Sequence, residues 1–596
     1  MVSFVDFTIM CGISGVVGKD AVKKTFEGLK FLEYRGYDSW GLAFESNNSL
    51  FVEKHVGKIG EANITDFESQ KVAIGHTRWA THGNVTKQNA HPHISNDGKI
   101  AIVHNGIVEN FSALKEKLSK NGFVFYSQTD SEIIANLIQY NVANSKDFLF
   151  GFAKSMREIE GNYAVVAMKL GEKKLYCARF GSPLVLGISE DSFFVGSDAT
   201  SFISYTKKAV FLEDNQIAVI GDDIKIFDTK TLKELKYHVK VLNWSVEQAK
   251  KGNFAHFMLK EILEQPITIK NSLEQPPDLI EKISKRIKSA KKIFLVGCGS
   301  SYHACLVGSY FFSSISSIET KPVLASEFYE QLNFSNADSL VIAISQSGET
   351  ADLIEAVKFA KSKGSKLVAI VNVMDSTLMR LADNSILMNC GPEICVLSTK
   401  SYTSQLAILL YLSYFCAGKK DEGKKIILDC AKEIGDFLSE KNISSLRKLV
   451  EKPVLSSTKD IFVIGRSIAY PTALESALKI KEVSYVHAEG FAGGELKHGT
   501  IALVNQGTPV ISLFTPETDK LILSNTIEMK SRGAYVIGIS SFSNNYFDHW
   551  IEVKDCGNAN PIMLIVPIQL ISYFLALTKN LDPDKPRNLA KSVTVK

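Results

Sequence analysis

Lys291-Lys-Ile-Phe-Leu-Val-Gly297 recurs later in the chain as Lys459-Asp-Ile-Phe-Val-Ile-Gly465. Each copy is a short apolar run that ends at glycine and precedes a long amphipathic pattern, as in a parallel strand covered by helices. A second pair repeats at nearly the same offset, because Ser362-Lys-Gly364 recurs as Ser531-Arg-Gly533 before an apolar run. This internal repeat predicts two tandem α/β domains of one topology, each built on a parallel sheet.

The chain ahead of the repeat has a different pattern. Residues 11–240 contain short β-type runs separated by turn residues and few long helical patterns, which predicts a β-rich α+β domain. Residues 241–285 are more polar and helical, and we expect them to form a linker. The first repeat domain, the second repeat domain and a C-terminal tail are then expected at 286–440, 455–583 and 584–596.

Length and composition limit the class of protein. At 596 residues the chain is too long for one hydrophobic core. With 68 Lys plus Arg and 64 Asp plus Glu, the formal charge is +4, and no block of like charges suggests nucleic acid as a partner. The longest apolar stretches, 562–578 and 406–418, are shorter than a membrane span, so no membrane is expected either. Nine cysteines without CxxC spacing, and an N-terminus without a signal-like basic front, favour the cytoplasm.

Cys11 stands just before an apolar run, in the segment Met10-Cys-Gly-Ile13. If Met10 were removed, a thiol and a free α-amine would share one residue, and an amine with a pKa of about 8 could take a proton as sulfur attacks an amide. The alternative is a buried cysteine that opens the first strand, which is the commoner situation for a single free cysteine. Because a peptide N–H is not a base, we expect the leader 1–10 to be a mis-assigned start or to be removed.

Four other residues could bind an amide substrate. Asn105 and Gly106 follow a strand-like run and offer a side-chain amide and a backbone N–H to an oxyanion. Arg78 could pair with an α-carboxylate, and Asp130 could hold an α-ammonium group. Each also has an ordinary interpretation, since Asn-Gly is a common turn and Arg and Asp are usually solvated.

A hydroxyl-rich loop, Ser345-Gln-Ser-Gly-Glu-Thr350, joins a strand-like run to a helical pattern. Hydroxyl and N–H groups at a helix N-terminus can hold a phosphate dianion, and one helix cap needs fewer hydroxyl groups than this loop has. The loop Cys298-Gly-Ser-Ser-Tyr302 fails the GxGxxG pattern at Tyr302, and GxxxxGK[ST] is absent, which argues against a nucleotide.

The second repeat carries ionisable groups in place of the hydroxyl-rich loop. Lys479 and Glu482 lie at i, i+3 on one predicted helix face, and Glu495-Leu-Lys-His498 follows. In isolation, such a pair is more simply a weak surface salt bridge. Five histidines of the N-terminal half, at positions 76, 82, 91, 93 and 104, have no carboxylate or thiol at helical ligand spacing among them, so we expect no metal.

Taken together, these segments resemble the glucosamine-6-phosphate synthase family, the isomerizing glutamine:fructose-6-phosphate aminotransferases, over essentially the whole chain. In the N-terminal half the resemblance is carried by Met10-Cys-Gly-Ile13, Leu32-Glu-Tyr-Arg-Gly-Tyr-Asp38, His76-Thr-Arg-Trp-Ala-Thr-His-Gly83, His91-Pro-His93, His104-Asn-Gly-Ile107 and Thr129-Asp130. In the C-terminal half it is carried by Ser345-Gln-Ser-Gly-Glu-Thr350, Leu397-Ser-Thr-Lys400, Gly494-Glu-Leu-Lys-His-Gly499 and Asp584-Lys-Pro-Arg-Asn-Leu-Ala-Lys-Ser-Val-Thr-Val595.

This resemblance implies an N-terminal-nucleophile glutaminase domain, an αββα sandwich, followed by two sugar isomerase (SIS) domains with flavodoxin-like parallel sheets. It implies the glutamine-dependent conversion of fructose 6-phosphate to glucosamine 6-phosphate plus glutamate, the first step of UDP-N-acetylglucosamine synthesis. Ammonia would be channelled between the two sites, and no cofactor is implied. The partners implied are glutamine, fructose 6-phosphate and a second copy of the chain bound through the isomerase domains.

The same resemblance implies roles for individual residues. Cys11 would be the nucleophile, Trp79 the channel gate, and Asn105 and Gly106 the oxyanion hole. Arg78, Thr81, His82 and Asp130 would bind glutamine, with Arg35 as support. The residues implied to bind the sugar phosphate are Ser300, Ser301, Ser345, Gln346, Ser347, Thr350, Val396, Ser398 and Ala590. Two departures are that Trp40 stands where the family has Ala and Ser300 where it has Thr.

Four further residues are implied to catalyse the sugar chemistry. His498, from the neighbouring subunit, would open the ring, and Glu482 would move a proton from C1 to C2. Lys591 would react with the carbonyl and Lys479 would stabilise the developing oxyanion. A lysine attacks a ketone only as the free amine, so we expect burial and neighbouring cations around Lys591.

Two other function classes fit parts of this pattern. One is an N-terminal-nucleophile amidase or protease whose α/β half only binds a sugar phosphate, and the other is a sugar-phosphate-sensing regulator. A sensor needs the hydroxyl-rich loop but not the four proton-transfer residues, whose joint presence favours an enzyme.

Overall fold

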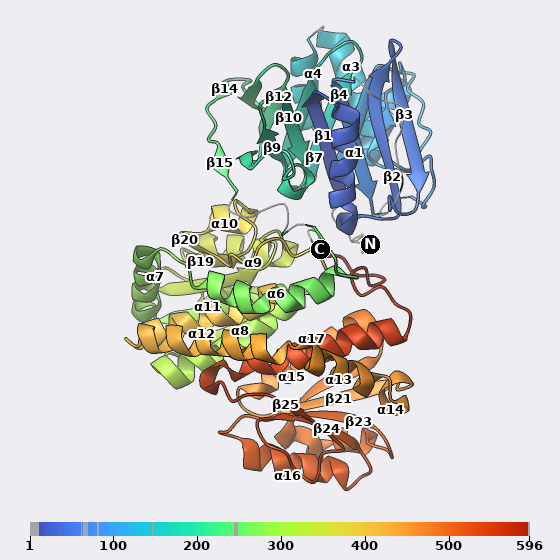
Figure 1. Ribbon diagram of the computed structural model, residues 1–596. Helices are drawn as coiled ribbons and strands as arrows, with labels where there is room; N and C mark the ends of the chain where they lie inside the picture. The colour runs from blue at the N-terminus through green and yellow to red at the C-terminus, as the bar shows by residue number, and fades with distance from the viewer. Residues whose placement is uncertain are drawn as a thin grey trace. The chain divides into compact units, whose positions relative to one another are not determined.

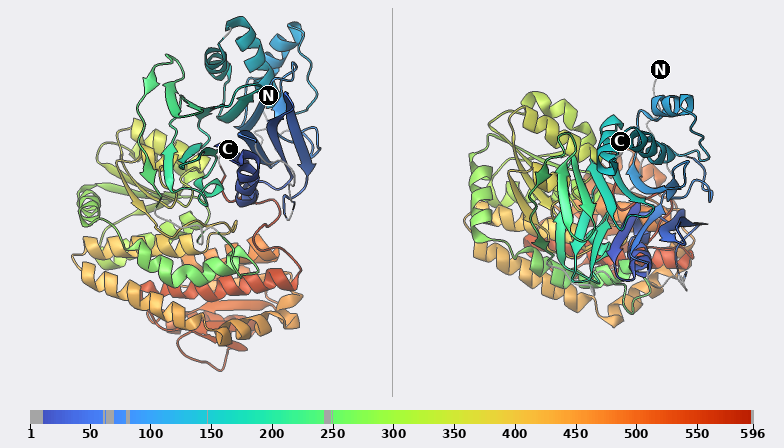
Figure 2. Two further views of the ribbon diagram at one scale, coloured as in Figure 1. Left: turned by 45° about the horizontal axis from the view of Figure 1, so that its top comes forward. Right: turned by 90° about the horizontal axis from the view of Figure 1, so that it is seen from above.

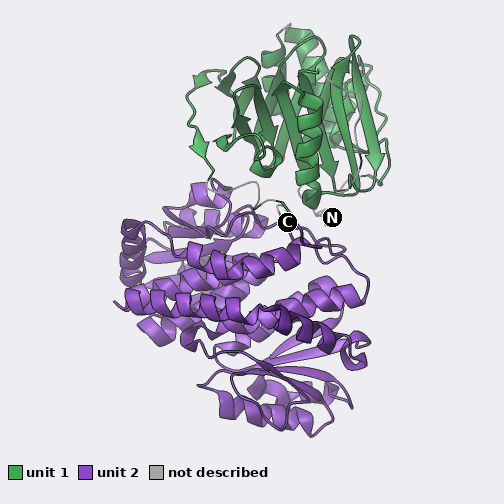
Figure 3. Ribbon diagram, in the orientation of Figure 1, with its two compact units in different colours: residues 1–250, 592–596 green, residues 251–591 purple. Residues whose placement is uncertain are grey.

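Figure 1 shows the protein as a computed structural model. The structure describes residues 11–60, 62, 70–79, 83–145, 147–242, 248 and 250–593. The chain divides into two compact units (Figure 3). Unit 1 contains residues 1–250 and 592–596, and unit 2 contains residues 251–591.

The described part of unit 1 is built on two antiparallel sheets, one of eight strands and one of seven. Their strand orders are β15-β11-β9-β10-β1-β4-β2-β3 and β14-β13-β12-β8-β7-β6-β5. The strands are β1 Gly12–Gly18, β2 Ser39–Ser46, β3 Ser49–Val56, β4 Val72–Arg78, β5 His93–Ile94, β6 Ile100–Gly106, β7 Tyr163–Lys169, β8 Leu175–Phe180, β9 Val185–Ile188, β10 Ser192–Gly196, β11 Lys208–Phe211, β12 Gln216–Ile220, β13 Ile224–Asp228, β14 Glu234–Leu235 and β15 Lys240–Val241. The helices are α1 Ala21–Phe31, η1 Glu33–Arg35, α2 Phe111–Lys120, α3 Glu132–Ser145, α4 Phe148–Glu158 and η2 Ala199–Ser201.

The layers of unit 1 follow from the alternation of side chains along its strands. In β1, Ile13 and Val17 belong to the core between the two sheets, whereas Val16 points the opposite way and packs with α1. Helices α3 and α4 cover the outer face of the seven-stranded sheet in the same manner (Figure 2). Unit 1 is therefore an αββα sandwich, which confirms the predicted fold of this half.

The described part of unit 2 contains two parallel sheets of five strands each. Their orders are β17-β16-β18-β19-β20 and β22-β21-β23-β24-β25, so both follow the flavodoxin-like arrangement 2-1-3-4-5 when numbered along the chain. The strands are β16 Lys292–Gly297, β17 Lys321–Leu324, β18 Ser339–Ser345, β19 Lys366–Val371, β20 Asn384–Leu387, β21 Asp460–Gly465, β22 His487–Ala492, β23 Pro509–Leu513, β24 Tyr535–Ser540 and β25 His549–Glu552. The repeated heptapeptides form β16 and β21, which confirms the predicted tandem topology.

A layer of helices lies between these two sheets, including α6, α11, α12 and α17 (Figures 1 and 2). The helices are α6 Phe257–Ser272, α7 Pro277–Ser289, α8 Ser300–Ser316, η3 Ala325–Phe334, α9 Ala351–Ser362, α10 Thr377–Leu381, α11 Lys400–Cys416, α12 Lys420–Phe437, α13 Glu440–Val450, α14 Pro453–Ser456, α15 Ala469–Ser484, η4 Gly493–His498, η5 Thr500–Leu503, α16 Asp519–Lys530, η6 Gly557–Ala559 and α17 Asn560–Thr578. We expected a linker at 241–285, but α6 contributes Met258 and Ile262 to the core of unit 2.

Helix α17 is nearly all apolar. Within the described residues, 557–578 is the one helix whose length and composition would allow it to cross a membrane, but 89% of its apolar window is buried inside the protein. Its polar Gln569 is also buried and accepts a hydrogen bond of 2.8 Å from Gln265 of α6. Helix α17 is therefore a core helix, as the sequence predicted.

Candidate active sites

The Cys11 thiol lies against the end of β4. Its Sγ accepts a hydrogen bond from the Trp79 backbone N–H at 3.3 Å and donates to the Trp79 carbonyl oxygen at 3.5 Å. Burial raises the pKa of the thiol to about 11, although Arg78 and Arg35 favour the thiolate. At neutral pH only about one thiol in 10⁴ would then be ionised. A nucleophile at this position therefore needs a nearby base.

Asn105, at the end of β6, is close to Cys11 despite the separation in sequence. Its Nδ2 donates a 2.8 Å hydrogen bond to the Cys11 carbonyl oxygen, and its Oδ1 lies 3.0 Å from Nε2 of His76. Because His76 Nε2 also lies 3.0 Å from the carbonyl oxygen of His104, this nitrogen must be the donor in both contacts. His76 therefore fixes the orientation of the Asn105 amide, with its NH₂ group directed at Cys11.

Gly106 completes the predicted oxyanion pair and cannot be replaced without strain. Its φ is +126°, and a Cβ at this position would lie 1.9 Å from the carbonyl oxygen of Asn162. The Asn-Gly pair thus ends strand β6 and does not form an isolated turn.

The predicted glutamine-binding residues are only partly described. Arg78 is buried and donates to the carbonyl oxygens of Gly83 at 3.3 Å and Asn84 at 3.5 Å. Asp130 is buried too, and its Oδ2 accepts a 2.8 Å hydrogen bond from the Val108 N–H. Thr81 and His82, which we also expected to bind glutamine, lie outside the described residues.

The surroundings of Cys11 are held by aromatic and charged contacts. The ring of Trp79 packs edge-on against Tyr37, with 4.8 Å between the ring centroids. Arg35 is buried and its Nη1 pairs with Asp198 at 3.3 Å. Trp40, which departs from the family pattern, stacks on the His55 ring and packs at an angle against Phe26.

A cluster of histidines lies beside this site. The His91 ring stacks on His76 at a centroid distance of 4.1 Å and meets His93 edge-on at 4.6 Å. Burial lowers the pKa of His76 to about 3 and lowers the pKa of His91, His93 and His104, so these rings are neutral at pH 7. Among the described residues, no group of three or more potential ligands could hold a metal ion.

The hydroxyl-rich loop of unit 2 lies at the C-terminal end of β18, where open α/β sheets bind their ligands. Ser345 Oγ accepts a 2.9 Å hydrogen bond from the Gly348 N–H and lies 3.2 Å from the hydroxyl of Thr350. Ser347 Oγ accepts from the Glu349 N–H at 3.2 Å. The chain turns sharply at Gly348, which has a φ of +67°. These contacts hold three hydroxyl groups at the N-terminus of α9.

A second group of hydroxyls lies at the N-terminus of α8. Ser301 Oγ accepts a 3.1 Å hydrogen bond from Gln405, and Ser300 Oγ accepts a 3.0 Å hydrogen bond from Lys479 Nζ. The contact between Ser300 and Lys479 joins the first repeat to the second. Both halves of unit 2 therefore contribute to one site.

Lys479 is completely buried and forms ion pairs with Glu475 at 3.3 Å and Glu482 at 2.8 Å. Burial favours the neutral amine, but the two carboxylates outweigh it and raise the pKa of Lys479. Burial raises the pKa of Glu482 despite the opposing charge of Lys479. The interpretation of Lys479 and Glu482 as a surface salt bridge is therefore wrong.

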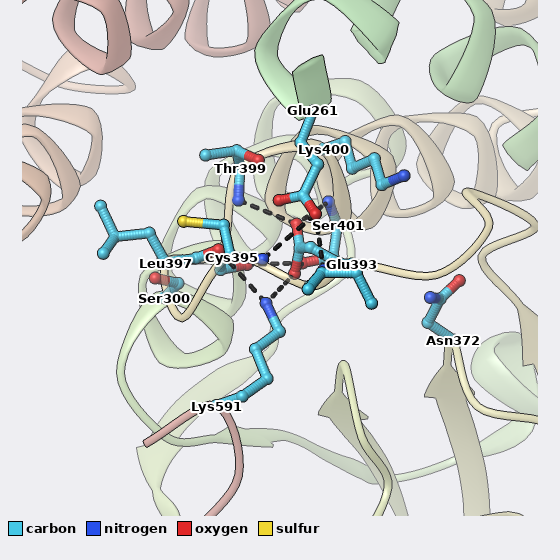
Figure 4. A network of polar contacts seen from close by, with 12 residues as sticks. Glu261, Ser300, Asn372, Glu393, Cys395, Leu397, Thr399, Lys400, Ser401 and Lys591 are labelled. Carbon is cyan, nitrogen blue, oxygen red and sulfur yellow. Dashed lines mark hydrogen bonds and ion pairs between the residues drawn. The ribbon is translucent and has the colours of Figure 1, made fainter. Parts of the chain in front are cut away.

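Lys591, near the end of the chain, lies beside the loop that carries Ser398 (Figure 4). Its Nζ is 2.5 Å from Oε2 of Glu393 and donates to the carbonyl oxygen of Leu397 at 3.2 Å. We expected cations around Lys591, and this expectation is wrong for its direct contact, which is a carboxylate. Ala590 precedes Lys591 and is partly exposed, and Val396 donates to the Asp584 carbonyl oxygen at 3.3 Å.

His498 is not brought to the other three ionisable groups. It is exposed on η4. Within the described residues, no hydrogen bond or ion pair joins it to Lys479, Glu482 or Lys591. A role for His498 at the site of its own subunit has no support from these contacts.

Sequence reasoning missed three ionisable residues of unit 2, which are Glu475, His303 and Glu393. Glu475 bridges Lys479 and His303, whose Nδ1 is 2.7 Å from the carboxylate. Glu475 lies one helical turn before Lys479, so i, i+4 spacing was the signal for it. Glu393 lies in an irregular segment that has no periodicity, and nothing in the sequence pattern connected it to Lys591.

Family comparisons agree with the two halves of the fold. Residues 10–234 match the glutamine amidotransferase domain family, and residues 286–413 and 454–578 match the SIS domain family. The solved C-terminal domain of the glucosamine-fructose-6-phosphate aminotransferase from Francisella tularensis is similar to unit 2. It has a TM-score of 0.52 and 30% identity and covers 56% of this chain and 99% of that one.

Full-length relatives are also similar. The glutamine--fructose-6-phosphate aminotransferase (isomerizing) of Pyrococcus horikoshii is 43% identical over 606 residues, covering 98% of this chain and all of that protein. The protein of the same name from Thermococcus kodakarensis is 42% identical over 610 residues with the same coverage. Identity at this level over 98% of this chain and all of each relative, together with the two matched domain families, shows that this chain belongs to the family of isomerizing glutamine--fructose-6-phosphate aminotransferases.

Proposed function

We propose that this protein transfers the amide nitrogen of glutamine to fructose 6-phosphate and releases glucosamine 6-phosphate and glutamate. One observation carries this proposal: two sites occur in one chain. One is the Cys11 site in a glutaminase fold, and the other combines the hydroxyls of the phosphate loop with the proton carriers Lys479 and Glu482. A sugar-phosphate sensor would need the hydroxyls but not the proton carriers. The relatives named above carry this activity in their names.

In unit 1, the Cys11 thiol would attack the amide carbonyl of glutamine. Since the pKa of the thiol is about 11, we propose that the active protein begins at Cys11 and that its α-amine takes the proton. The NH₂ group of Asn105 and the N–H of Gly106 would bind the oxyanion. Arg78 would pair with the α-carboxylate of glutamine and Asp130 with its α-ammonium group, together with Thr81 and His82.

In unit 2, the phosphate would bind at the N-terminus of α9. The hydroxyls there and the N–H groups of the first helical turn are suited to a dianion, and the helix dipole adds to the attraction. The residues proposed to bind the sugar phosphate are Ser300, Ser301, Ser345, Gln346, Ser347, Thr350, Val396, Ser398 and Ala590.

The sugar chemistry requires several proton transfers. Lys591 would form an imine with the C2 carbonyl and release water, and ammonia would then displace the lysine. Glu482, whose pKa is raised by burial, would carry the proton that leaves C1 to C2. Lys479 would stabilise the oxyanion, and His498 of a second copy would open the sugar ring.

Three further features belong to this proposal. Ammonia becomes ammonium in water at neutral pH, so we propose an enclosed path between the sites with Trp79 as its gate. We propose a homodimer joined through unit 2, because His498 is exposed in one chain. A cytoplasmic location is compatible with the nine cysteines, all of which lie in the described part of the chain without a disulfide.

Incubation with glutamine and fructose 6-phosphate tests the proposal. Glucosamine 6-phosphate should appear only when both substrates are present. Glutamine hydrolysis without any amino sugar would favour a simple amidase. Binding of fructose 6-phosphate without either product would favour a sensor.

A further inference from the structure

Glu393 lies between β20 and α11 in a segment without regular structure, and its side chain is completely buried. Its Oε1 accepts hydrogen bonds from the N–H groups of Thr399 at 2.9 Å and Ser401 at 3.0 Å. Its Oε2 accepts from the Ser401 hydroxyl at 2.7 Å and from Lys591 Nζ at 2.5 Å (Figure 4). Four donors from two distant parts of the chain therefore meet at one carboxylate.

We propose that Glu393 is a positioning residue that orders both Lys591 and Ser398 for the sugar reaction. The inference rests on the proposed role of Lys591 as the group that forms an imine with the substrate. Glu393 is assigned no contact with the substrate and no proton transfer.

The first argument concerns Lys591. A lysine side chain has four flexible bonds, and fixing its end requires a directional partner. The contacts of Nζ with Glu393 and with the Leu397 carbonyl oxygen supply that partner. Lys591 and the donors of Ser401 outweigh burial and lower the pKa of Glu393, so the carboxylate keeps its charge. This charge favours the ammonium form of Lys591, so Glu393 is assigned the position of Nζ and not its activation; the two N–H groups of the free amine can still donate to Glu393 and to the Leu397 carbonyl oxygen.

The second argument concerns the direction of a hydroxyl relay. The Ser401 hydroxyl has one proton and donates it to Glu393, while its oxygen lies 2.6 Å from Oγ of Ser398. Ser398 must therefore be the donor in that contact. Its remaining lone pairs can only accept, so Ser398 would accept a hydrogen bond from a sugar hydroxyl. Glu393 thus determines which hydrogen-bonding role Ser398 offers to the substrate.

The third argument is that Glu393 positions Lys591 and Ser398 and is not needed to attach the C-terminal tail to unit 2. The tail is held elsewhere, because the Asp584 carboxylate accepts N–H groups of Phe257 and Met258, each at 2.7 Å. The segment around Glu393 is also held from its other side, where Glu261 accepts the N–H of Ile394 at 2.5 Å. Loss of the Glu393 charge should therefore disturb Lys591 and Ser398 and leave the tail docked.

Glu393→Gln tests the proposal because it keeps the size of the side chain and one acceptor oxygen but removes the charge that holds Lys591. Borohydride added with fructose 6-phosphate reduces an imine to a stable secondary amine, which mass spectrometry locates on the peptide that contains Lys591. At a pH high enough for Lys591 to be the free amine in both proteins, we expect adduct formation in Glu393→Gln to be slower by about tenfold or more. Glu393→Asp keeps the charge and should recover part of the rate. Glu281→Gln, in an exposed ion pair of α7, is the matched control and should label at the wild-type rate.

Two companion measurements make the result decisive. The thermal unfolding midpoint of unit 2 should stay near the wild-type value in Glu393→Gln, which shows that the unit that carries the substitution is folded. Ser401→Ala breaks the relay but leaves the contact between Lys591 and Glu393, so it should raise KM for fructose 6-phosphate more than it lowers the labelling rate at saturation.

Wild-type labelling of Lys591 in a folded Glu393→Gln protein would overturn the inference, as would an equal loss of labelling in Glu281→Gln. If the wild-type protein itself forms no adduct at Lys591 but still makes amino sugar, the proposed role of Lys591 fails, and the inference fails with it. Absence of amino sugar from the wild-type protein would instead refute the proposed function.

Discussion

Replacement of Asn105 by alanine tests the geometry of the glutaminase site most sharply. In the structure the Asn105 NH₂ group already donates to the Cys11 carbonyl oxygen at 2.8 Å, while His76 holds the other end of the amide at 3.0 Å. The donor is therefore fixed before substrate arrives, which is the condition for stabilising an oxyanion without reorganisation. Loss of one such donor lowers kcat by about 10²–10³-fold.

Asn105→Ala should lower the free energy of unfolding much less than it raises the activation free energy of glutamine hydrolysis. His76 keeps its 3.0 Å hydrogen bond to the His104 carbonyl oxygen, so its buried N–H is not left unpaired. Removal of a neutral hydrogen bond then costs about 1 kcal/mol. The variant should therefore fold and show a defect in the chemical step.

The assay is glutamate release from glutamine, with amino-sugar formation from ammonium chloride and fructose 6-phosphate measured in parallel. Asn105→Ala should lose about 10²–10³-fold in kcat for glutamine with little change in KM, because Arg78 and Asp130 hold the amino-acid part. The ammonia-driven rate should remain at the wild-type level. Asn121→Ala, on an exposed side chain of unit 1, is the control. A decrease in kcat for glutamine of less than about threefold in Asn105→Ala would refute the reasoning. So would an equal decrease in the ammonia-driven rate.

Four more outcomes are expected. The first concerns protein that retains residues ahead of Cys11. The rate at which iodoacetamide alkylates the Cys11 thiol should rise about tenfold per pH unit above pH 7, because the reactive thiolate becomes more abundant, and should level off near the pKa of about 11. A plateau near pH 8 would contradict this. Gly106→Ala should lower the thermal unfolding midpoint of unit 1, since a Cβ there meets backbone at 1.9 Å; an unchanged midpoint would count against the structure. Lys479→Met leaves the buried Glu475 carboxylate and the partly buried Glu482 carboxylate without Lys479 and should cost about 3–5 kcal/mol in denaturant unfolding of unit 2, whereas a surface pair would cost less than about 1 kcal/mol. Trp79→Ala should leave glutamine hydrolysis running while amino-sugar formation falls, and equal loss of both activities would contradict a gating role.

The repeated topology of unit 2 could be predicted because its signal is local. The segments that form β16 and β21 are apolar runs of nearly the same sequence, and each occupies the same inner position in its sheet. The role of α6 could not be predicted in this way. Its sequence is mixed in polarity, and only the packing of Met258 and Ile262 between distant elements makes it part of the core.

The residues of the candidate sites also fall into those that the sequence could reveal and those that only the tertiary structure reveals. Cys11 and Asn105 stood in recognisable segments, and the structure brings them together. The burial of Lys479 is a tertiary property, since the i, i+3 pattern with Glu482 is identical on a surface helix. Glu393 lies in an irregular loop, and its contact with Lys591 spans 198 residues, so neither periodicity nor spacing could reveal it.

The central claim is that nitrogen passes from glutamine at Cys11 to the sugar without mixing with the solvent. The direct measurement supplies glutamine labelled with ¹⁵N in its amide, fructose 6-phosphate and an excess of unlabelled ammonium, and determines the ¹⁵N content of the glucosamine 6-phosphate by mass spectrometry. The amino sugar formed from the same ammonium without glutamine is measured separately and subtracted. Nearly complete labelling, with one glutamate formed per amino sugar, is the predicted result. Labelling diluted to the isotope ratio of the free ammonium, or glutamate formed without amino sugar, would contradict the account.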